Sequence, residues 1–368
     1  AATPDVVVVG GGAVGLGVAW RCALAGASVR VFDSSGGRGA TWTAAGLLAP
    51  VTEVHYGEEP LLDLNLESSR RYPSFVAELE DATGLATGYR QCGTLMVARD
   101  ADENRALDEL FRFQSDLGLE VQRLTGRETR AEEPALAPSV RGGIFVEGDH
   151  QVDNRALLTA LTKACTRVGV TVSEEAVTGV EVRGDRVEGV TTRGGSVPCR
   201  NVVVAAGSWS GGIDGVPIVP VRPVKGQLIH LKGPAPIVRR NVRGVDAYLV
   251  PRPDGRLVVG ATVEERGWDT SVTAGAVHEL LRAAYELLPG TAELELTEAI
   301  AGLRPAAPDN APLIGPTEIE GLLMATGHYR NGVLLTPVTA DAIAAFVTAS
   351  EPPAWTKLFL PTRFGAAA

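Results

Sequence analysis

The first 33 residues alternate between strand-like and helix-like patterns of apolar positions. Val6–Val9 are four consecutive β-branched residues and predict a fully buried strand. An alanine-rich segment follows, and a second apolar run ends at Asp33, 23 positions after Gly10. This order predicts a parallel β-α-β unit at the start of the sequence.

Strand-like and helix-like patterns continue irregularly along the rest of the chain. Helices are predicted over 59–85, 102–117, 153–168, 277–288 and about 333–347, with Asp153 or Asn154 as the N-cap of the third. Strands are predicted over 92–98, 170–172, 177–182, 187–192, 201–205, 227–231 and 322–325. Residues 34–50 are rich in Gly, Ala, Ser and Thr and are predicted as a loop. Pro253-Asp254-Gly255 separates two apolar runs and predicts a hairpin within an antiparallel segment, 225–262.

Gly10, Gly12 and Gly15 supply a GxGxxG spacing between the first strand and the first helix. Gly10 permits the tight turn, Gly12 lets a pyrophosphate approach the backbone, and Gly15 lets helix and strand pack closely. The helix N-terminus favours phosphate through its unpaired N–H groups and its dipole. Asp33 suits a ribose 2′-hydroxyl and repels a 2′-phosphate, which argues against NADP. The unit predicts an adenine-dinucleotide site, and a packing turn without a ligand is the alternative.

The order of the elements predicts a discontinuous dinucleotide domain. The strand at 201–205 and the C-terminal strand–turn–helix can complete the sheet begun by residues 6–33. NAD-linked dehydrogenases usually keep this domain contiguous, whereas an extended FAD suits a glutathione-reductase-like fold. We therefore expect an α/β fold with an α+β substrate part: a Rossmann FAD-binding domain over 1–85, 140–220 and 300–368, and a substrate domain with an antiparallel β-sheet over 86–139 and 221–299.

Composition and charge narrow the possible partners. The 368 residues are 45% hydrophobic and 21% charged, which is typical of a soluble globular protein. A net charge of −10 without a basic stripe predicts no nucleic-acid and no membrane partner. The N-terminal sequence lacks a signal-peptide pattern, so a cytoplasmic enzyme is expected. Four scattered cysteines and five histidines without ligand spacing predict free thiols and no metal site.

Seven motifs, in order along nearly the whole chain, resemble the D-amino-acid oxidase family of FAD oxidoreductases, and most of all its glycine-oxidase branch of thiamine biosynthesis. They are Gly10–Gly15, Thr43–Ala49, Pro223–Gly226, Tyr248–Arg252, Gly255–Thr262, Ala301–Pro305 and Gly327–Gly332. The resemblance implies noncovalent FAD, because no cysteine lies near 302–316, where relatives carry a covalent flavin link.

The resemblance also implies a set of FAD contacts. The loop around Gly46 would lie beside the isoalloxazine, Val177 would contact the adenine, and the segment from His328 would meet the flavin pyrimidine edge. Val177 as an ordinary strand residue and His328 as a structural histidine are the alternatives. The full set is Gly10, Gly12, Ala13, Val14, Gly15, Asp33, Ser34, Ala40, Thr41, Ala45, Gly46, Leu47, Val177, Gly207, His328, Tyr329, Arg330, Asn331, Gly332, Val333 and Leu334.

Three residues are candidates for catalysis. An oxidised amino acid needs its carboxylate fixed, and a guanidinium does this with two parallel hydrogen bonds. The resemblance places Arg304 there, with Tyr248 donating to the same carboxylate and Arg330 nearby. Arg304 could instead be a structural salt-bridge partner, and Tyr248 could be a core residue.

The resemblance implies oxidative deamination of glycine, sarcosine or D-alanine to the imine and 2-oxo acid, with O2 reduced to hydrogen peroxide. It further implies a homo-oligomer and an imine product available to a thiazole synthase. A D-amino-acid oxidase of broader specificity, an amine dehydrogenase of the same family, an NAD-dependent dehydrogenase and a noncatalytic flavin-binding module remain alternatives. Asp246, Leu47 and Val263 depart from the glycine-oxidase pattern, and Asp246 would attract the amine if it faced the substrate.

Overall fold

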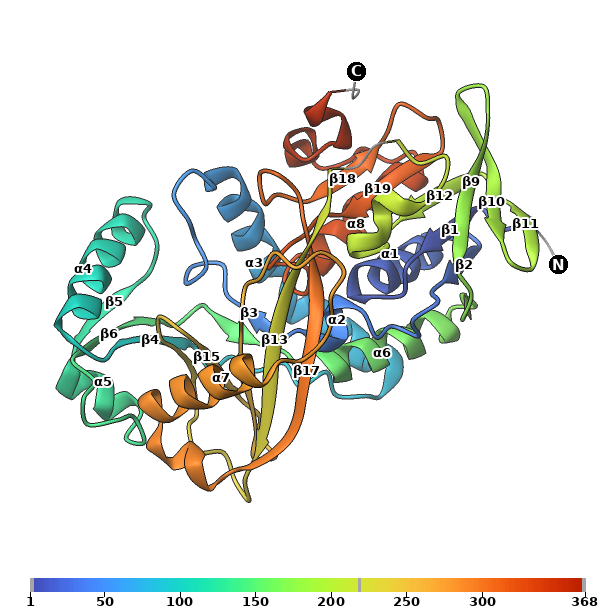
Figure 1. Ribbon diagram of the computed structural model, residues 1–368. Helices are drawn as coiled ribbons and strands as arrows, with labels where there is room; N and C mark the ends of the chain where they lie inside the picture. The colour runs from blue at the N-terminus through green and yellow to red at the C-terminus, as the bar shows by residue number, and fades with distance from the viewer. Residues whose placement is uncertain (1–2, 218–219, 366–368) are drawn as a thin grey trace.

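The computed structural model describes residues 3–217 and 220–365. Its first sheet has six strands, and the N-terminal strand lies near the centre (Figure 1). The strand order is β18 (Leu313–Pro316), β19 (Leu322–Thr326), β12 (Asn201–Val204), β1 (Val6–Val9), β2 (Val29–Phe32) and β8 (Thr171–Ser173). All neighbours are parallel except β18 and β19. The discontinuous sheet expected from the sequence is therefore confirmed, because β1 pairs with the distant β12.

The two faces of this sheet have different coverings. Val6 and Val8 face a core shared with the helices α1 (Ala13–Leu24), α3 (Glu59–Thr83), α6 (Asn154–Arg167) and α8 (Thr336–Val347). Val7 and Val9 face the antiparallel meander β9 (Val177–Arg183), β10 (Arg186–Thr192) and β11 (Gly195–Pro198). Alternate valines of one strand thus enter two cores, which explains why β1 is continuously apolar.

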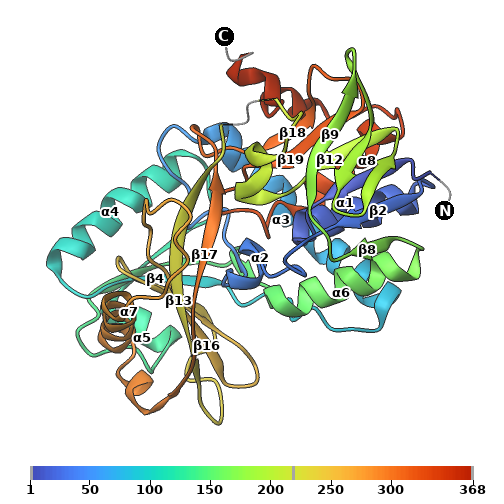
Figure 2. The same cartoon turned by 45° about the vertical axis from the view of Figure 1, so that its right-hand side comes forward.

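The second sheet has eight strands and is mainly antiparallel. Its order is β17 (Glu295–Ala306), β13 (Arg222–Lys232), β16 (Arg256–Gly260), β15 (Tyr248–Pro251), β14 (Asn241–Arg243), β4 (Thr94–Ala98), β6 (Gly142–Val146) and β5 (Gln122–Thr125). The helix α7 (Ala274–Leu287) packs on one face, and α4 (Ala101–Asp116) and α5 (Gly126–Glu132) lie at the β4–β6–β5 end. In Figures 1 and 2 the long strands β13 and β17 run between the two halves of the molecule.

The remaining elements are short. They are α2 (Ala40–Thr43), the paired strands β3 (Leu47–Leu48) and β7 (His150–Gln151), and the 3₁₀ turns η1 (Gly207–Gly212), η2 (Pro289–Glu293), η3 (Ala354–Leu358) and η4 (Pro361–Phe364). Within the described ranges, no helix combines the length and apolar character needed to cross a membrane.

Most predicted elements are confirmed, two expectations are wrong, and some strands were not predicted. Asp153 is the N-cap of α6, and the 253–255 turn joins β15 to β16 as an antiparallel hairpin. The predicted loop 34–50 contains α2 and β3. The last helix begins at Thr336, not at 333, since Pro337 fits only the first turn of a helix and turns precede it. The twelve residues of β17 were not expected as a strand, because their outer half is polar and largely exposed.

The predicted domain boundaries cut across the second sheet. Gly142–Val146 pairs with β4 and β5, and Ile300–Ala306 continues the pairing of β17 with β13. A division that follows the sheets would move both segments from the FAD-binding part to the substrate part. Residues 1–2, 218–219 and 366–368 of the predicted ranges lie outside the described residues.

Gly15→Ala should destabilise the apoprotein by about 1–3 kcal/mol, because overpacking a tight contact has this cost. A Cβ on Gly15 would lie 2.0 Å from the carbonyl oxygen of Gly10, so the backbone would have to move. Urea unfolding measures the change. Gly275→Ala is the control, since a Cβ there meets nothing within 4 Å; equal stability of the two variants would contradict the packing argument.

Candidate active site between the two sheets

A cavity of about 780 Å³ lies where the carboxyl ends of the parallel strands face the second sheet. It extends from the turn after β1 to Tyr248 and Arg304. All of the predicted cofactor and catalytic residues line it except Gly15, Asn331 and Leu334. Asn331 and Leu334 are buried instead, and the carbonyl of Leu334 accepts a hydrogen bond from Ser68. Sequence segments far apart along the chain therefore meet at one site.

The glycine turn leaves the cavity open at the start of α1. Gly10 has a φ of +112°, and a Cβ on it would lie 2.3 Å from the carbonyl oxygen of Ala205. Gly12 precedes α1, and the hydroxyl of Thr41 accepts a hydrogen bond of 3.0 Å from the amide of Ala13. The helix thus begins at the cavity wall without any charged side chain in its first turn. Its N-terminus suits an anionic ligand.

Asp33 ends β2 and organises the loop that follows it. One carboxylate oxygen accepts hydrogen bonds from the amide and hydroxyl of Ser35, at 2.7 and 2.6 Å, and the other accepts from the amide of Gly11. Asp33 also lines the cavity, as Val177 does. Its carboxylate therefore links the glycine turn to the next loop at the place where a ribose would lie.

The segment between β19 and α8 contributes His328, Tyr329 and Arg330 to the cavity. The Nε2 atom of His328 lies 3.0 Å from the hydroxyl of Thr339, and the side chain is 3% exposed. Burial lowers the pKa of His328 to about 3, so the ring is neutral near pH 7. The His328 ring therefore offers no positive charge to a ligand.

Three arginines line the cavity, and two of them have carboxylate partners. Arg243 lies 2.8 Å from Glu53, and Arg330 lies 3.1 Å from Glu58. Arg304 makes no ion pair with any described residue; its Nη1 donates only to the carbonyls of Lys225 and Thr262, at 3.3 and 3.1 Å.. Its charge is therefore the one left for a ligand carboxylate.

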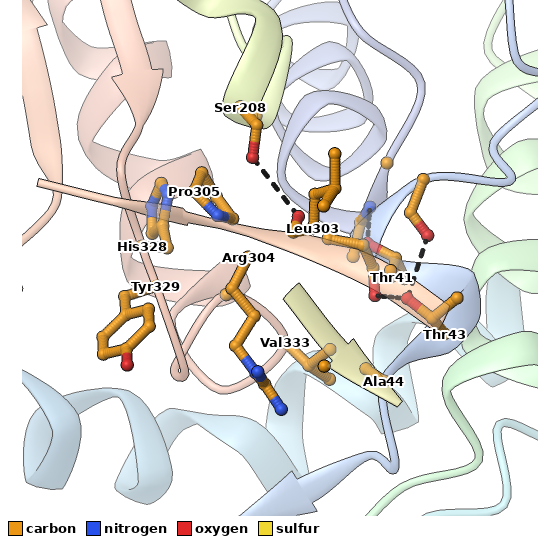
Figure 3. Close-up of a pocket in the computed structure, with 18 of the residues that line it drawn as sticks. Thr41, Thr43, Ala44, Ser208, Leu303, Arg304, Pro305, His328, Tyr329 and Val333 are labelled. Atoms are coloured by element: carbon orange, nitrogen blue, oxygen red, sulfur yellow. Dashed lines mark hydrogen bonds between the residues drawn. The ribbon is translucent and has the colours of Figure 1, made fainter. Parts of the chain in front are cut away.

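Figure 3 shows the Arg304 side chain leaving β17 toward the space between Tyr329, Val333 and Ala44. On the same strand, the Leu303 carbonyl accepts a hydrogen bond from the hydroxyl of Ser208. The loop residues Ala45 and Leu47 share an apolar cluster with Tyr248 at this end of the cavity. The small loop residues, Tyr248 and Arg304 thus surround one space.

Tyr248 lies beside Arg304 in a confined position. Burial raises the pKa of the Tyr248 hydroxyl, and the charge of Arg304 opposes this shift only in part. The phenol is therefore protonated near pH 7 and able to donate a hydrogen bond. A Cβ on Gly260 would lie 2.5 Å from the Tyr248 hydroxyl oxygen, so Gly260 leaves the room this ring needs.

Asp246 is paired with a protein cation. Its carboxylate lies 2.8 Å from Arg99 and is 45% exposed, although the residue lines the cavity mouth. The expectation that Asp246 would attract a substrate amine is weakened, because its carboxylate is engaged by Arg99, which also pairs with Glu103 and Glu286. The sequence did not reveal that Glu53 and Glu58 pair with Arg243 and Arg330. The only available signal was that two acidic residues lie close together directly after the loop 34–50.

The site offers no metal-binding or thiol chemistry among the residues that are described. These residues include no group of three or more His, Cys, Asp and Glu that could hold a metal ion. Burial raises the pKa of the thiols of Cys22, Cys165 and Cys199 to about 12, and none of them lines the cavity.

The chain fits FAD on its own geometry. The open helix N-terminus suits a pyrophosphate, Asp33 suits a ribose, and the cavity continues to the second sheet, where a reacting ring could meet Arg304 and Tyr248. A dinucleotide site that continues to an arginine without a carboxylate partner among the described residues fits a flavin-dependent oxidoreductase.

Comparison with known proteins agrees with this class. The family described as FAD dependent oxidoreductase (DAO) matches residues 5–346, and the chain belongs to this family. The chain is 36% identical to the "Bifunctional protein ThiO/ThiG" of Synechocystis sp. over 98% of its length and 54% of that protein. It is 33% identical to "Glycine oxidase" of Geobacillus kaustophilus, covering 94% of this chain and 93% of that one.

Solved structures agree in fold. The crystal structure of the Geobacillus kaustophilus glycine oxidase has a TM-score of 0.92 at 32% identity, with 98% of each chain covered. That of iminodiacetate oxidase from Chelativorans sp. has a TM-score of 0.88 at 27% identity, with 97% and 98% covered. The present chain spans about half the length of the bifunctional relatives.

His328→Gln should reduce the loss of stability at acid pH. Between about 3 and 6.5 the unfolded chain binds a proton at His328 that the folded chain does not, so stability falls as pH decreases through this range. The variant lacks this contribution, so its stability relative to wild type should increase by up to about 1.4 kcal/mol per pH unit below pH 6. Urea unfolding of the apoprotein at several pH values measures it, with the exposed His278→Gln as control; a pH-independent difference would contradict the buried neutral ring.

Proposed function

We propose that this protein oxidises glycine and other small amines such as sarcosine and D-alanine, using noncovalent FAD and O2. The reaction with glycine would be glycine + O2 + H2O → glyoxylate + NH3 + H2O2, through the imine. The observation that carries the proposal is the position of Arg304, a cavity-lining arginine without an ion-pair partner among the described residues. The relatives named as glycine oxidases support the same activity.

Arg304 and Tyr248 would hold the substrate carboxylate. A guanidinium can donate two parallel hydrogen bonds to a carboxylate, and the protonated Tyr248 can donate a third. Fixing the carboxylate aims the Cα–H bond at one place, and orientation of this kind supplies much of the rate increase in oxidations. Arg243 also lines the cavity, but it is paired with Glu53 and so would not compete with Arg304 for the substrate carboxylate.

The cofactor contacts would follow the cavity wall. The N-terminus of α1 with Thr41 would hold the pyrophosphate, Asp33 the ribose, and Val177 the adenine, while Ala45 and Gly46 would lie against the ring. Bound FAD supplies the two-electron oxidation. The absence of any cavity-lining cysteine among the described residues is consistent with noncovalent attachment.

The bifunctional relatives suggest a partner. Their names join ThiO to ThiG, and this chain covers about half of their length. We propose that the imine product can be passed to a thiazole synthase, and that the chain works as a homo-oligomer, as the family resemblance implies. Oxygen consumption without an added electron acceptor distinguishes this oxidase from an amine dehydrogenase.

The cavity mouth favours a second candidate, an oxidase of larger apolar D-amino acids. Trp209 and Trp268 stack at 5.5 Å between ring centroids and are 50% and 56% exposed, and Val245 and Val263 beside the cavity are also largely exposed. Such side chains could cover an apolar substituent that glycine lacks. Relative peroxide production from glycine and from apolar D-amino acids decides between the two candidates.

Arg304→Lys should lower kcat/KM for glycine about 30-fold or more while the protein keeps its FAD. A lysine cannot reproduce the two-fold donation, and the loss of one hydrogen bond to a charged group costs about 1.5–3 kcal/mol. Peroxide production at equal flavin content measures the loss. The control is Arg222→Lys, an exposed arginine paired with Glu265 outside the cavity. Retention of kcat/KM within about threefold by Arg304→Lys would assign Arg304 a structural role.

Asp33→Ala should weaken FAD binding by about 1.5–3 kcal/mol, because the ribose loses a charged acceptor. The measurement is a titration of apoprotein with FAD, followed by flavin fluorescence. Asp185→Ala removes the same charge at an exposed hairpin turn and is the matched control. Equal dissociation constants for the two variants would contradict the role of Asp33 in binding the ribose. They would not contradict the role of the glycine turn in binding the pyrophosphate.

A further inference from the structure

Arg252 is an arginine that the proposed chemistry does not use. It is 1% exposed and does not line the cavity. No described carboxylate lies within ion-pairing distance, although Asp153 is near enough to act on its pKa, which burial lowers to about 10. Burying a guanidinium without a direct ion pair is costly, so its hydrogen bonds must hold something that matters to the fold or the site.

The guanidinium joins its own hairpin to two other segments that are far apart in sequence. Its Nη2 donates to the carbonyl of Ala45 at 2.7 Å and reaches the side-chain oxygen of Asn154 at 3.4 Å. Its Nη1 donates to the side-chain oxygen of Gln151 at 2.5 Å. Asn154 in turn donates to the carbonyls of Thr41 and Trp42. Arg252 and Asn154 therefore bind the turn between α2 and β3, and neither side chain lines the cavity.

This turn forms part of the cavity wall. Gly46 has a φ of +75°, and a Cβ on it would lie 2.0 Å from the carbonyl oxygen of Val152. The amide of Val152 donates to the Gly46 carbonyl at 2.9 Å. Both carbonyls of the Ala45–Gly46 pair are thus bound on the side away from the cavity.

The orientation of one peptide follows from these contacts. In a trans peptide the C=O and the next N–H point in opposite directions. With the Ala45 carbonyl on Arg252, the N–H of Gly46 points away from Arg252, and Gly46 itself lines the cavity. No acceptor among the described residues takes the N–H of Ala45 or of Gly46. The turn therefore presents backbone donors to whatever ring lies against it.

We propose that Arg252 is a positioning residue that fixes the Ala45–Gly46 peptide so that its N–H faces the bound flavin ring. The flavin would then depend on a side chain that it does not touch. The inference rests on FAD binding, and not on glycine as the substrate. Loss of the guanidinium would let this peptide rotate, which would remove a donor from the ring and could turn a carbonyl toward it.

Arg252→Met should therefore raise the dissociation constant of FAD at least tenfold and shift the visible absorption spectrum of the flavin that remains bound. Arg252→Lys keeps a charge but cannot hold Ala45 and Gln151 together, so its spectrum should also differ from wild type. The matched control is Arg256→Met. It lies on the same hairpin, pairs with Asp153 and Asp254, and has no contact with the Ala45 turn.

The outcomes separate a positioning role from a structural one. A wild-type spectrum in Arg252→Lys, or equal effects of Arg252→Met and Arg256→Met on spectrum and affinity, would overturn the proposal. If Arg252→Met does not fold, Arg252→Lys alone decides, because the lysine keeps the buried charge but lacks the fork that holds Ala45 and Gln151. Neither readout needs turnover, so failure of the glycine assignment would not affect them.

Discussion

The close approach of β1, α1 and β12 at the glycine turn is the constraint on which the rest of the molecule depends. The backbones of Gly10, Gly15 and Ala205 leave no room for a Cβ at either glycine. This contact brings the start of α1 to the carboxyl edge of the sheet, where it lies at the cavity wall beside the Thr41 hydroxyl. The other segments that line the cavity lie around this edge of the first sheet.

The second sheet completes the site from the opposite side. Its strands β13 and β17 carry the residues around Arg304, while the loop that follows β2 supplies the small side chains between them and the glycine turn. Ion pairs within the protein then determine which of the cavity-lining arginines is available to a ligand. Because Glu53 and Glu58 each engage one arginine, the site keeps a single cation without a carboxylate at its polar end, among the residues described.

Local signals allowed much of the fold to be predicted from the sequence. The glycine spacing, the cap at Asp153 and the 253–255 turn each depend on a few neighbouring residues, and all three are found in the structure. The pairing of Arg330 with Glu58 and the contact of Arg252 with Ala45 join segments more than 200 positions apart, and no local pattern reveals them. Of the candidate site, the motifs therefore indicated which segments meet, but not which charges neutralise one another.

The pairing of β17 with β13 makes the position of Arg304 a matter of register. Val224 lies opposite Arg304 and Lys225 opposite Leu303, and successive side chains on a strand point to opposite faces. A slip of one residue would move each side chain of β17 to the opposite face of the sheet, so the guanidinium would leave its place beside Tyr248. The ladder contains one irregularity, between His230 and Leu231, at the end remote from Arg304. The pairing is regular from Arg222 to His230, and this unbroken run of pairs fixes the side of the sheet on which Arg304 lies.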